Sequence, residues 1–336
     1  MNIDERFMYR AIQLAKNGKG NTSPNPIVGA VIVHDGTIIG EGYHRRCGEG
    51  HAEVNAVASV TNRSLLKDST IYVTLEPCSH YGRTPPCAEL IIDSGIRRVV
   101  IGSPDPSDKV NGRGINMLRK AGIDVTTGIL ERECRKLNPA FMTCHTLGRP
   151  LVTLKWAQSA DGYIDRKRTA EDTPSIFSTP VTAALSHRLR TLNDAIMVGS
   201  GTMLYDRPSL TARLWPGHNP LRVTTDRSGV IHSPDNKFTI LGREDDGSTA
   251  SYLKALHDKG ITSVLVEGGA RLLQSFIDSG MWDTARVEVA PTALGDGVKA
   301  PLLCIRPTES LTVGNNCIYY YDNPDKQSLK TTKNIK

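Results

Sequence analysis

His51-Ala52-Glu53, followed by Pro77-Cys78 and then by Cys87, is the stretch of sequence that decides how the first half of this chain folds and what it binds. Zinc in a catalytic site takes three nitrogen or sulfur ligands from the protein and keeps a fourth position for water. His51, Cys78 and Cys87 supply one nitrogen and two sulfurs. Glu53 stands where zinc deaminases carry a glutamate that moves protons and is not a ligand. The pattern therefore predicts a catalytic zinc site that deaminates a nucleobase-like ring.

The segments around these residues are consistent with such a site. Residues 71–75 are mostly β-branched or aromatic and predict a buried strand that ends just before the first cysteine. Helical runs over 52–58 and 88–93 each begin directly after a ligand. A ligand at a helix N-terminus lies in a positive partial field, which favours thiolate over thiol. Zinc bound there lowers the pKa of water from roughly 15.7 to about 7, so hydroxide is available at neutral pH.

Other interpretations of these residues are weaker. A His-x-Glu motif alone is common on helices, and Cys78 and Cys87 alone could be core cysteines or a redox pair. His80 is a rival ligand, but the three-ligand pattern is complete without it. A structural zinc module that supports a nucleotide sensor would need four ligands and no proton shuttle, so Glu53 argues against it.

Length and composition place the chain in a broad class. Its 336 residues suit roughly two domains, and 39% hydrophobic with 23% charged residues is typical of a globular protein. We expect no membrane association, because no run of about 18 apolar residues occurs. The acidic start of the chain does not resemble a signal peptide. Seven cysteines, an odd number, favour a reducing cytoplasm over a disulfide framework.

The formal charge of +6 would attract a phosphate-bearing ligand, although a lysine-rich C-terminal tail contributes to it. Aromatic residues make up only 5% of the chain, and no basic stripe with interleaved aromatics occurs. We therefore expect no nucleic-acid partner.

Strands and helices alternate along the chain after an initial helix (4–17) and hairpin (27–43), which predicts an α/β fold with a mixed sheet covered by helices on both faces. The segment 141–150 has low periodicity and ends in Gly148-Arg149-Pro150, which we interpret as a linker. We therefore expect a first domain over 1–145, a linker at 146–150 and a second domain over 151–321. The polar residues 322–336 are expected to be disordered.

Four stretches resemble the family of bifunctional riboflavin-biosynthesis proteins, which join a pyrimidine deaminase to a reductase. They are residues 22–33 (TSPNPIVGAVIV), 42–44 (GYH), 50–55 (GHAEVN) and 74–87 (TLEPCSHYGRTPPC). The spacing of the two cysteines separates this family from deaminases with a Cys-x-x-Cys pair. The resemblance continues from Lys155 to Leu294. It implies a cytidine-deaminase-like first domain and a second domain similar to dihydrofolate reductase.

For the first domain, the resemblance implies deamination of 2,5-diamino-6-(5-phosphoribosylamino)pyrimidin-4-one, a phosphorylated pyrimidine, to 5-amino-6-(5-phosphoribosylamino)uracil. Glu53 would carry the proton to the leaving amine. Asn25, His44 and Arg83 match positions around the family's substrate pocket, and an arginine suits a phosphate. The family usually carries Asp-Pro-Asn-Pro where this chain has Asp105-Pro106-Ser107-Asp108, which puts a substrate contact from that loop in doubt.

For the second domain, the resemblance implies hydride transfer from NADPH that converts the ribosyl group to ribityl. The sequence lacks a Gly-x-Gly-x-x-Gly fingerprint, since Gly199-Ser200-Gly201 is followed by leucine at position 204. Residues 266–270 fit a phosphate-binding turn better than residues 199–201, because they predict a strand, a glycine turn and the start of a helix. The implied cofactor-binding residues are Ala157, Ile176, Thr202, Asp206, Gly269, Ala270, Arg271 and Leu272. The implied substrate-binding residues are Arg190, Leu210, Arg213 and Glu267.

Lys155 and Asp206 are both candidates for polarising or protonating the sugar oxygen, and the sequence leaves the choice open. Two departures bear on the reductase: the family often has tryptophan where this chain has Ile176, and the segment 226–262 is shorter than in many relatives. The alternative is a zinc deaminase with a degenerate second domain that serves binding or dimerisation. We also expect the chain to form a homo-oligomer.

Overall fold

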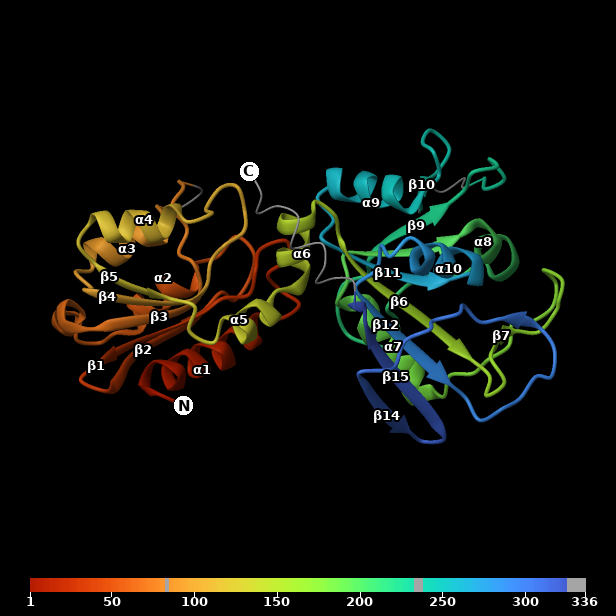
Figure 1. Ribbon diagram of the computed structural model, residues 1–336, viewed down its shortest axis with the longest axis horizontal. Coiled ribbons are helices and arrows are strands. Elements are labelled where there is room, and N and C mark those ends of the chain that lie inside the picture. Colours follow the sequence, from red (N-terminus) through yellow and green to blue (C-terminus); the bar gives the residue numbers. More distant parts are fainter. Residues whose placement is uncertain (82–84, 233–237, 325–336) are drawn as a thin grey trace. The chain divides into compact units, whose positions relative to one another are not determined.

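The computed structural model describes residues 1–81, 85–232 and 238–324 of the chain (Figure 1). They form two units, Met1–Gly148 and a second that begins at Arg149. No helix within the described ranges is long and apolar enough to cross a membrane.

The first unit is built on a five-stranded mixed sheet with the order β2-β1-β3-β4-β5. The β1–β2 and β1–β3 pairs are antiparallel, and the β3–β4 and β4–β5 pairs are parallel. The strands are β1 (Gly29–His34), β2 (Thr37–Tyr43), β3 (Thr70–Leu75), β4 (Arg98–Ser103) and β5 (Asp124–Thr127). The helices are α1 (Ile3–Ala15), η1 (Lys16–Gly18), α2 (Ala52–Ser59), η2 (Arg63–Asp68), α3 (Cys87–Asp93), α4 (Arg113–Lys120), α5 (Glu131–Leu137) and α6 (Pro139–Leu147).

Alternation along the strands produces two cores in this unit, one on each face of the sheet. On β1, Val31 and Val33 pack with α1 and α5, whereas Ala30 and Ile32 pack with α2, α3 and α4. Figure 1 shows α1 and α5 on one side of the sheet and α3 and α4 on the other. The carboxyl end of β3 therefore faces the start of α2 and α3, which carry the predicted ligands.

Helix α2 approaches strand β2 closely because Gly42 has no side chain. A Cβ atom at Gly42 would lie 2.3 Å from the backbone nitrogen of Ala56 and 2.5 Å from the carbonyl oxygen of Ala52. We predict that Gly42→Ala lowers the free energy of unfolding by about 1–3 kcal/mol, because the helix must move away from the sheet. Urea denaturation measures this. Gly201→Ala is the control, since a Cβ there meets nothing within 4 Å; equal stability of the two variants would contradict the prediction.

The second unit contains an eight-stranded sheet with the order β10-β9-β8-β11-β6-β12-β15-β14 and a two-stranded sheet β13-β7. The large sheet is parallel from β10 to β12, and β15 and β14 are antiparallel. The strands are β6 (Leu151–Gln158), β7 (Tyr163–Asp165), β8 (Ala195–Gly199), β9 (Leu221–Thr225), β10 (Thr239–Leu241), β11 (Ser263–Gly268), β12 (Thr284–Val289), β13 (Val298–Lys299), β14 (Glu309–Val313) and β15 (Asn316–Asp322). The helices are α7 (Pro180–Thr191), α8 (Ser200–Asp206), α9 (Thr249–Asp258) and α10 (Ala270–Asp278).

The two faces of this sheet differ in character. Val152, Leu154 and Trp156 of β6 pack with α9 and α10 in a large apolar core. The opposite face has a smaller apolar cluster, around Ile196 and Leu265, which Leu189 of α7 and Met203 of α8 adjoin. Lys155 alternates with the apolar residues of β6 and so points to this second face.

The structure differs from the sequence expectations in the linker, in several short elements and at the start of the C-terminal tail. Helix α6 covers most of the segment 141–150 that we expected to be a linker, and the expected linker 146–150 begins inside that helix. Asn138, at the start of α6, explains why the segment is ordered, because its amide both donates to and accepts from the backbone of Ile27. Strands β7, β10, β13 and β14 and helices α5 and α8 were not expected.

The expected disordered tail, 322–336, begins too early. Asp322 is the last residue of β15, and Asn323 is buried with its amide donating to the carbonyls of Gly280 and Trp282. These bonds fix the start of the tail. Residues 325–336 lie outside the described part of the chain.

Candidate active sites

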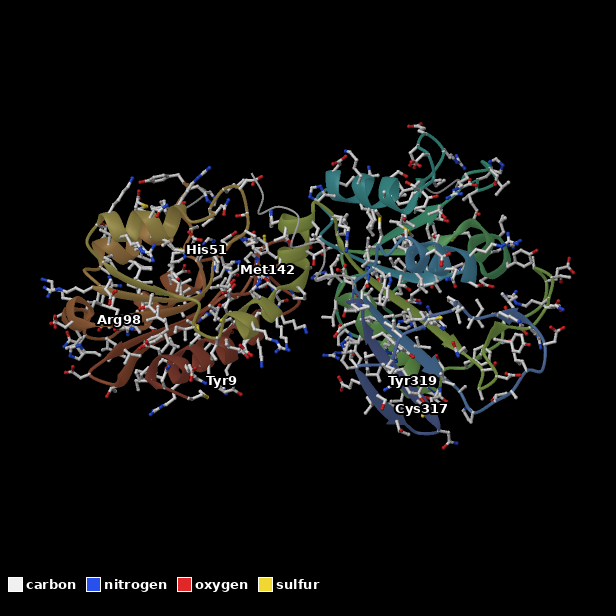
Figure 2. All side chains as sticks on the ribbon, in the orientation of Figure 1. Tyr9, His51, Arg98, Met142, Cys317 and Tyr319 are labelled. Carbon is white, nitrogen blue, oxygen red and sulfur yellow. The ribbon has the colours of Figure 1, made fainter. Side chains whose placement is uncertain are left out.

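His51, Cys78 and Cys87 meet at one point of the first unit. His51 is the N-cap of α2, Cys78 follows β3, and Cys87 is the first residue of α3. The His51 Nδ1 atom lies 3.3 Å from the Cys87 sulfur and 3.6 Å from the Cys78 sulfur. All three ligand atoms lie within 4.8 Å of one another (Figure 2 labels His51). One imidazole nitrogen and two sulfurs at this spacing suit zinc.

The pKa values of the two cysteine thiols are shifted in opposite directions. The thiol of Cys87 donates to Cys78, whose pKa falls to about 4, and the backbone N–H of Cys87 donates to the same sulfur at 3.3 Å. The pKa of Cys87 rises because it is the donor of that hydrogen bond and is buried. Hydrogen bonding to Cys78 raises the pKa of His51. A thiolate is therefore already favoured at one ligand.

Glu53 lies beside this cluster, on the first turn of α2, and is only 3% exposed. Burial, together with a smaller effect of the nearby Cys78, raises the pKa of its carboxyl group to about 7. A buried carboxyl group close to three metal ligands can hold or release a proton without competition from bulk water.

His44 lies next to the ligand cluster, and Asn25 lies beside His44. His44 is 2% exposed, and its ring meets the ring of His51 edge-on with centroids 5.4 Å apart. Its Nε2 atom lies 3.5 Å from the Asn25 amide nitrogen. Burial lowers the pKa of His44. His80 is exposed and is not in the ligand cluster, and Arg83 lies outside the described residues.

Glu76 is a buried residue that the sequence reasoning missed. Its carboxylate accepts hydrogen bonds from the backbone N–H groups of Asp105, Gly112 and Ile115, at 3.1–3.2 Å. It thus satisfies amide donors at the start of α4 and fixes the loop 105–108. Ser107, in the loop that departs from the family pattern, is buried, and its N–H donates to the Asp105 carboxylate. The only available signal was an acidic residue next to Pro77-Cys78.

We predict that Glu76→Gln lowers the free energy of unfolding of the first unit by about 1–3 kcal/mol. The glutamine amide nitrogen cannot accept a hydrogen bond, so at least one buried N–H loses its partner. Thermal and urea denaturation measure this. Glu133→Gln, at an exposed position of α5, is the control and should change stability little; the same small change at Glu76 would show that its hydrogen bonds contribute little.

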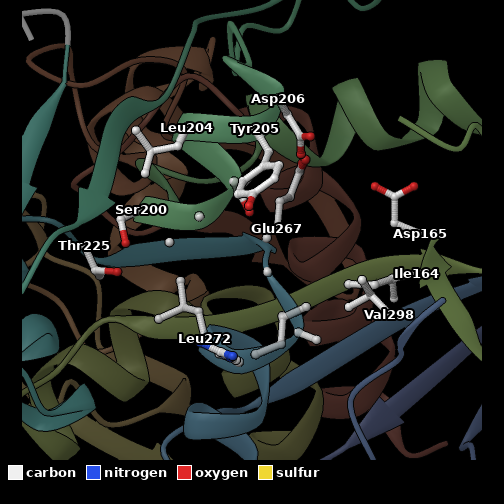
Figure 3. Close-up of a pocket in the computed structure, with 18 of the residues that line it drawn as sticks. Ile164, Asp165, Ser200, Leu204, Tyr205, Asp206, Thr225, Glu267, Leu272 and Val298 are labelled. Atoms are coloured by element: carbon white, nitrogen blue, oxygen red, sulfur yellow. The ribbon is translucent and has the colours of Figure 1, made fainter. Parts of the chain in front are cut away.

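A cavity of about 1090 Å³ opens in the second unit, at the carboxyl ends of β6, β8, β9 and β11 (Figure 3). Figure 3 shows Asp206, Glu267 and Ile164 around it, from α8, β11 and β7. The lining contains six cationic and three acidic side chains, which gives it a net positive charge. The cationic ones are Lys155, Arg166, Lys167, Arg168, Arg227 and Arg271, and the acidic ones are Asp165, Asp206 and Glu267. Such a cavity suits an anionic ligand.

Most of the expected cofactor and catalytic residues line this cavity. They are Lys155, Ala157, Thr202, Asp206, Gly269, Ala270, Arg271 and Leu272. The expected substrate residue Glu267 also lines it. Ile176 is not among the lining residues and is 85% exposed, so the structure does not bring it to the cavity.

Three expected substrate residues, Arg190, Leu210 and Arg213, are not among the residues that line the cavity. Arg190 donates two hydrogen bonds to Glu267, at 2.7 and 2.9 Å, and a third to the Thr211 carbonyl. Leu210 is buried and has a φ angle of +51°, and Arg213 is exposed and donates to Ser209. Arg190 therefore reaches the cavity only through Glu267.

Lys155 and Asp206 have different surroundings. Asp206 accepts a hydrogen bond from Arg168, which also pairs with Asp165. Lys155 has no hydrogen-bond or ion-pair partner within the part of the chain that the structure describes. Burial lowers the pKa of Lys155, and the charge of Glu267 acts in the opposite direction.

The turn from β11 into α10 brings backbone close to the cavity. Gly269 has a φ angle of +70°, which favours glycine, and a Cβ at Gly268 would lie 3.0 Å from Val198 and 3.1 Å from Thr202. The amide groups at the start of α10 are accessible because these positions have no side chain.

Two family models match the chain. Residues 1–103 match the cytidine and deoxycytidylate deaminase zinc-binding region, and residues 150–313 match the RibD C-terminal domain. Together with the histidine–cysteine–cysteine cluster, these matches define the class: a zinc-dependent deaminase domain followed by an α/β reductase domain.

Whole-length relatives give the family. The chain is 37% identical to the riboflavin biosynthesis protein RibD of Aquifex aeolicus, over 91% of this chain and 92% of that one, and 41% identical to RibD of Bacillus amyloliquefaciens, over 90% and 88%. A crystal structure from Thermotoga maritima superposes with a TM-score of 0.83 at 36% identity, over 96% of this chain and 99% of that one. The chain belongs to the RibD family of bifunctional riboflavin-biosynthesis deaminase/reductases, which confirms the resemblance.

Proposed function

We propose that this chain catalyses two reactions in sequence: hydrolytic deamination of 2,5-diamino-6-(5-phosphoribosylamino)pyrimidin-4-one, then NADPH-dependent reduction of the ribosyl group of the product to ribityl. The Thermotoga maritima relative is described as a diaminohydroxyphosphoribosylaminopyrimidine deaminase and 5-amino-6-(5-phosphoribosylamino)uracil reductase. The observation that carries the proposal is the ligand cluster with buried Glu53 beside it, in a chain whose second unit holds a separate cationic cavity.

The first unit would bind one zinc ion through His51, Cys78 and Cys87. When bound, zinc supplies a hydroxide nucleophile at neutral pH by lowering the pKa of water. Glu53 takes a proton on its carboxylate and returns it to the leaving amine, which departs as ammonia. His44 and Asn25, in contact with each other beside His51, orient the pyrimidine ring. Arg83 binds the phosphate of the substrate.

The second unit would bind NADPH and the deaminated product in its cavity. NADPH supplies the hydride. The amide groups at the start of α10 and the side chains of Arg271 and Thr202 hold the cofactor phosphates, because the cavity is cationic there. Glu267 contacts the substrate, and Arg190 fixes the position of that carboxylate.

Lys155 is the better of the two candidates for donating a proton to the sugar oxygen. Asp206 is engaged by the Arg168 guanidinium, and a carboxylate in an ion pair accepts hydrogen bonds and has no proton to give. The Lys155 ammonium has three donors, lines the cavity and has no partner among the described residues. We therefore assign Lys155 the role of proton donor and Asp206 a role in holding the cofactor.

Mass spectrometry of the diaminopyrimidine ribosyl phosphate, incubated with zinc-loaded protein with and without NADPH, tests the proposal. We expect an amine-to-carbonyl exchange without NADPH and a gain of two hydrogens with it. Deamination with NADPH left untouched would support a degenerate second domain. No change in either incubation would contradict the proposed substrate.

Two further expectations stay predictions. We propose that the protein is cytoplasmic, as its cysteine usage indicates, and that it is a homo-oligomer. Sedimentation velocity of the zinc-loaded protein measures the second.

A further inference from the structure

A row of charged side chains crosses the face of the second unit's sheet that α7 covers. Lys155 of β6 pairs in parallel register with Arg286 of β12, and Glu288 follows two residues later on the same face. Val266 of β11 pairs with Leu154, which places Glu267 beside Lys155. Residues in register on neighbouring strands point to the same face. The row therefore contains two cations and two acids, with the cationic Arg190 of α7 bonded to it.

Both acidic side chains of this row accept hydrogen bonds from residues other than Lys155. Glu267 accepts two hydrogen bonds from Arg190. Glu288 is fully buried, and it accepts from the Ser178 hydroxyl at 2.9 Å and from the Asn316 amide at 2.6 Å. Arg286 lies 3.9 Å from the same carboxylate. Both carboxylates are therefore held by other partners, and within the described residues neither forms an ion pair with Lys155.

Arg286 is an unusual residue for this position. It is 4% exposed, its Nη1 atom lies 3.4 Å from the Ser186 hydroxyl, and its buried Nη2 atom has no hydrogen-bond partner among the described residues. A buried arginine with incomplete hydrogen bonding costs stability. Such a cost calls for a role other than packing.

We propose that Arg286 and Glu288 are positioning residues for Lys155: Arg286 engages Glu288 and repels the Lys155 ammonium, so that the amine stays unpaired and directed to the ligand cavity. This inference rests on the proposed function only for the use that the reductase makes of Lys155. The placement of the amine is a property of the fold.

The charges around Lys155 predict effects of opposite sign. Glu267 and Glu288 raise the pKa of Lys155, whereas Arg286 and Arg190 lower it. His187 of α7 also faces this region, but burial lowers its pKa and its Nδ1 atom accepts from the Leu214 N–H, so it is neutral near pH 7. Removing Arg286 should therefore raise the pKa of Lys155, and removing the charge of Glu288 should lower it.

Competitive labelling with a small amine-reactive acylating reagent, read by peptide mass spectrometry across pH, measures the titration of Lys155 in the full-length protein without substrate. We expect Arg286→Met to shift this titration upward by about one pH unit and Glu288→Gln to shift it downward by a similar amount. Arg286→Lys should restore the wild-type titration. Arg222→Met removes a cation from β9, where Arg222 stacks on Phe238, and is the matched control that should leave Lys155 unchanged.

Opposite shifts distinguish this role from a structural one. A variant that merely loosened the sheet would expose Lys155 and move its titration upward, whichever residue was changed. Lys155 titrating as in the wild type in both variants, or moving upward in both, would overturn the proposal. If Arg286→Met does not fold, the direction in which the Lys155 titration shifts in Glu288→Gln decides alone.

The reductase assay separates this inference from the proposed function. Because Lys155 must be protonated to act as the donor, the alkaline limb of the NADPH-oxidation rate should move with the Lys155 titration, upward in Arg286→Met and downward in Glu288→Gln. Labelling shifts without a matching move of the alkaline limb would support the placement of the amine and contradict the assigned role of Lys155. A matching move of the alkaline limb would support both the placement of the amine and the role of Lys155 as proton donor.

Discussion

Glu53→Gln should lower the deaminase turnover by roughly 10²–10⁴-fold and leave zinc bound. The substitution keeps the size of the side chain and removes the group that holds the proton. Glu53 is not one of the three predicted zinc ligands, which are His51, Cys78 and Cys87, so the metal content should stay at one zinc per chain. Ammonia release, measured with a coupled assay, and zinc, measured by atomic emission, report the two effects separately.

Glu49→Gln is the matched control, because Glu49 is exposed and lies just before the same helix. It should deaminate at the wild-type rate. The reductase rate, measured on pre-deaminated substrate, should be unchanged in both variants, since Glu53 belongs to the other unit. Wild-type ammonia release by Glu53→Gln would contradict the mechanism, and loss of zinc would show that Glu53 helps to hold the ion.

Lys155→Met should lower the reductase rate by roughly 10²–10⁴-fold while deamination continues at the wild-type rate. Methionine fills similar space and has no proton to donate to the sugar oxygen. Binding of NADPH, measured by fluorescence titration, should change much less than the turnover, because the amine acts on the sugar. NADPH oxidation with pre-deaminated substrate measures the turnover.

Lys254→Met is the control for this substitution. Lys254 is exposed on α9 and pairs with Asp258, away from the cavity. Asp206→Asn provides the comparison that decides between the two candidates. A larger loss of turnover in Asp206→Asn than in Lys155→Met would reverse the assignment and make Asp206 the proton donor.

Local patterns in the sequence were sufficient for the zinc site. His51 and Cys87 lie at the starts of helices, and Cys78 follows the end of a buried strand. A helix start is one of the clearest signals in a sequence. The structure brings these three residues together with Glu53 beside them, as the motif implied. The strands of both sheets that alternate with helices were also largely predictable, because burial imposes a period on them.

Short edge elements were less predictable. Strands β10 and β14 lie at the two edges of the large sheet, where one side has no neighbour to impose a pattern. Helix α6 has few periodic apolar residues, and the contact of Asn138 with Ile27, 111 positions away, is invisible in a local window.

The sequence by itself determined which atoms can bind zinc and which carboxyl group accompanies them, because those residues are neighbours along short segments. The tertiary structure alone decided that Glu76 accepts hydrogen bonds from the start of α4, that Arg190 binds Glu267, and that Lys155 stays unpaired beside Arg286. These contacts depend on how strands and helices pack in the fold. Arg190 and Glu267 are 77 positions apart in the sequence, and Lys155 and Arg286, which pair in register, are still further apart. The charge on each residue is fixed by its type, but its partner is fixed by packing.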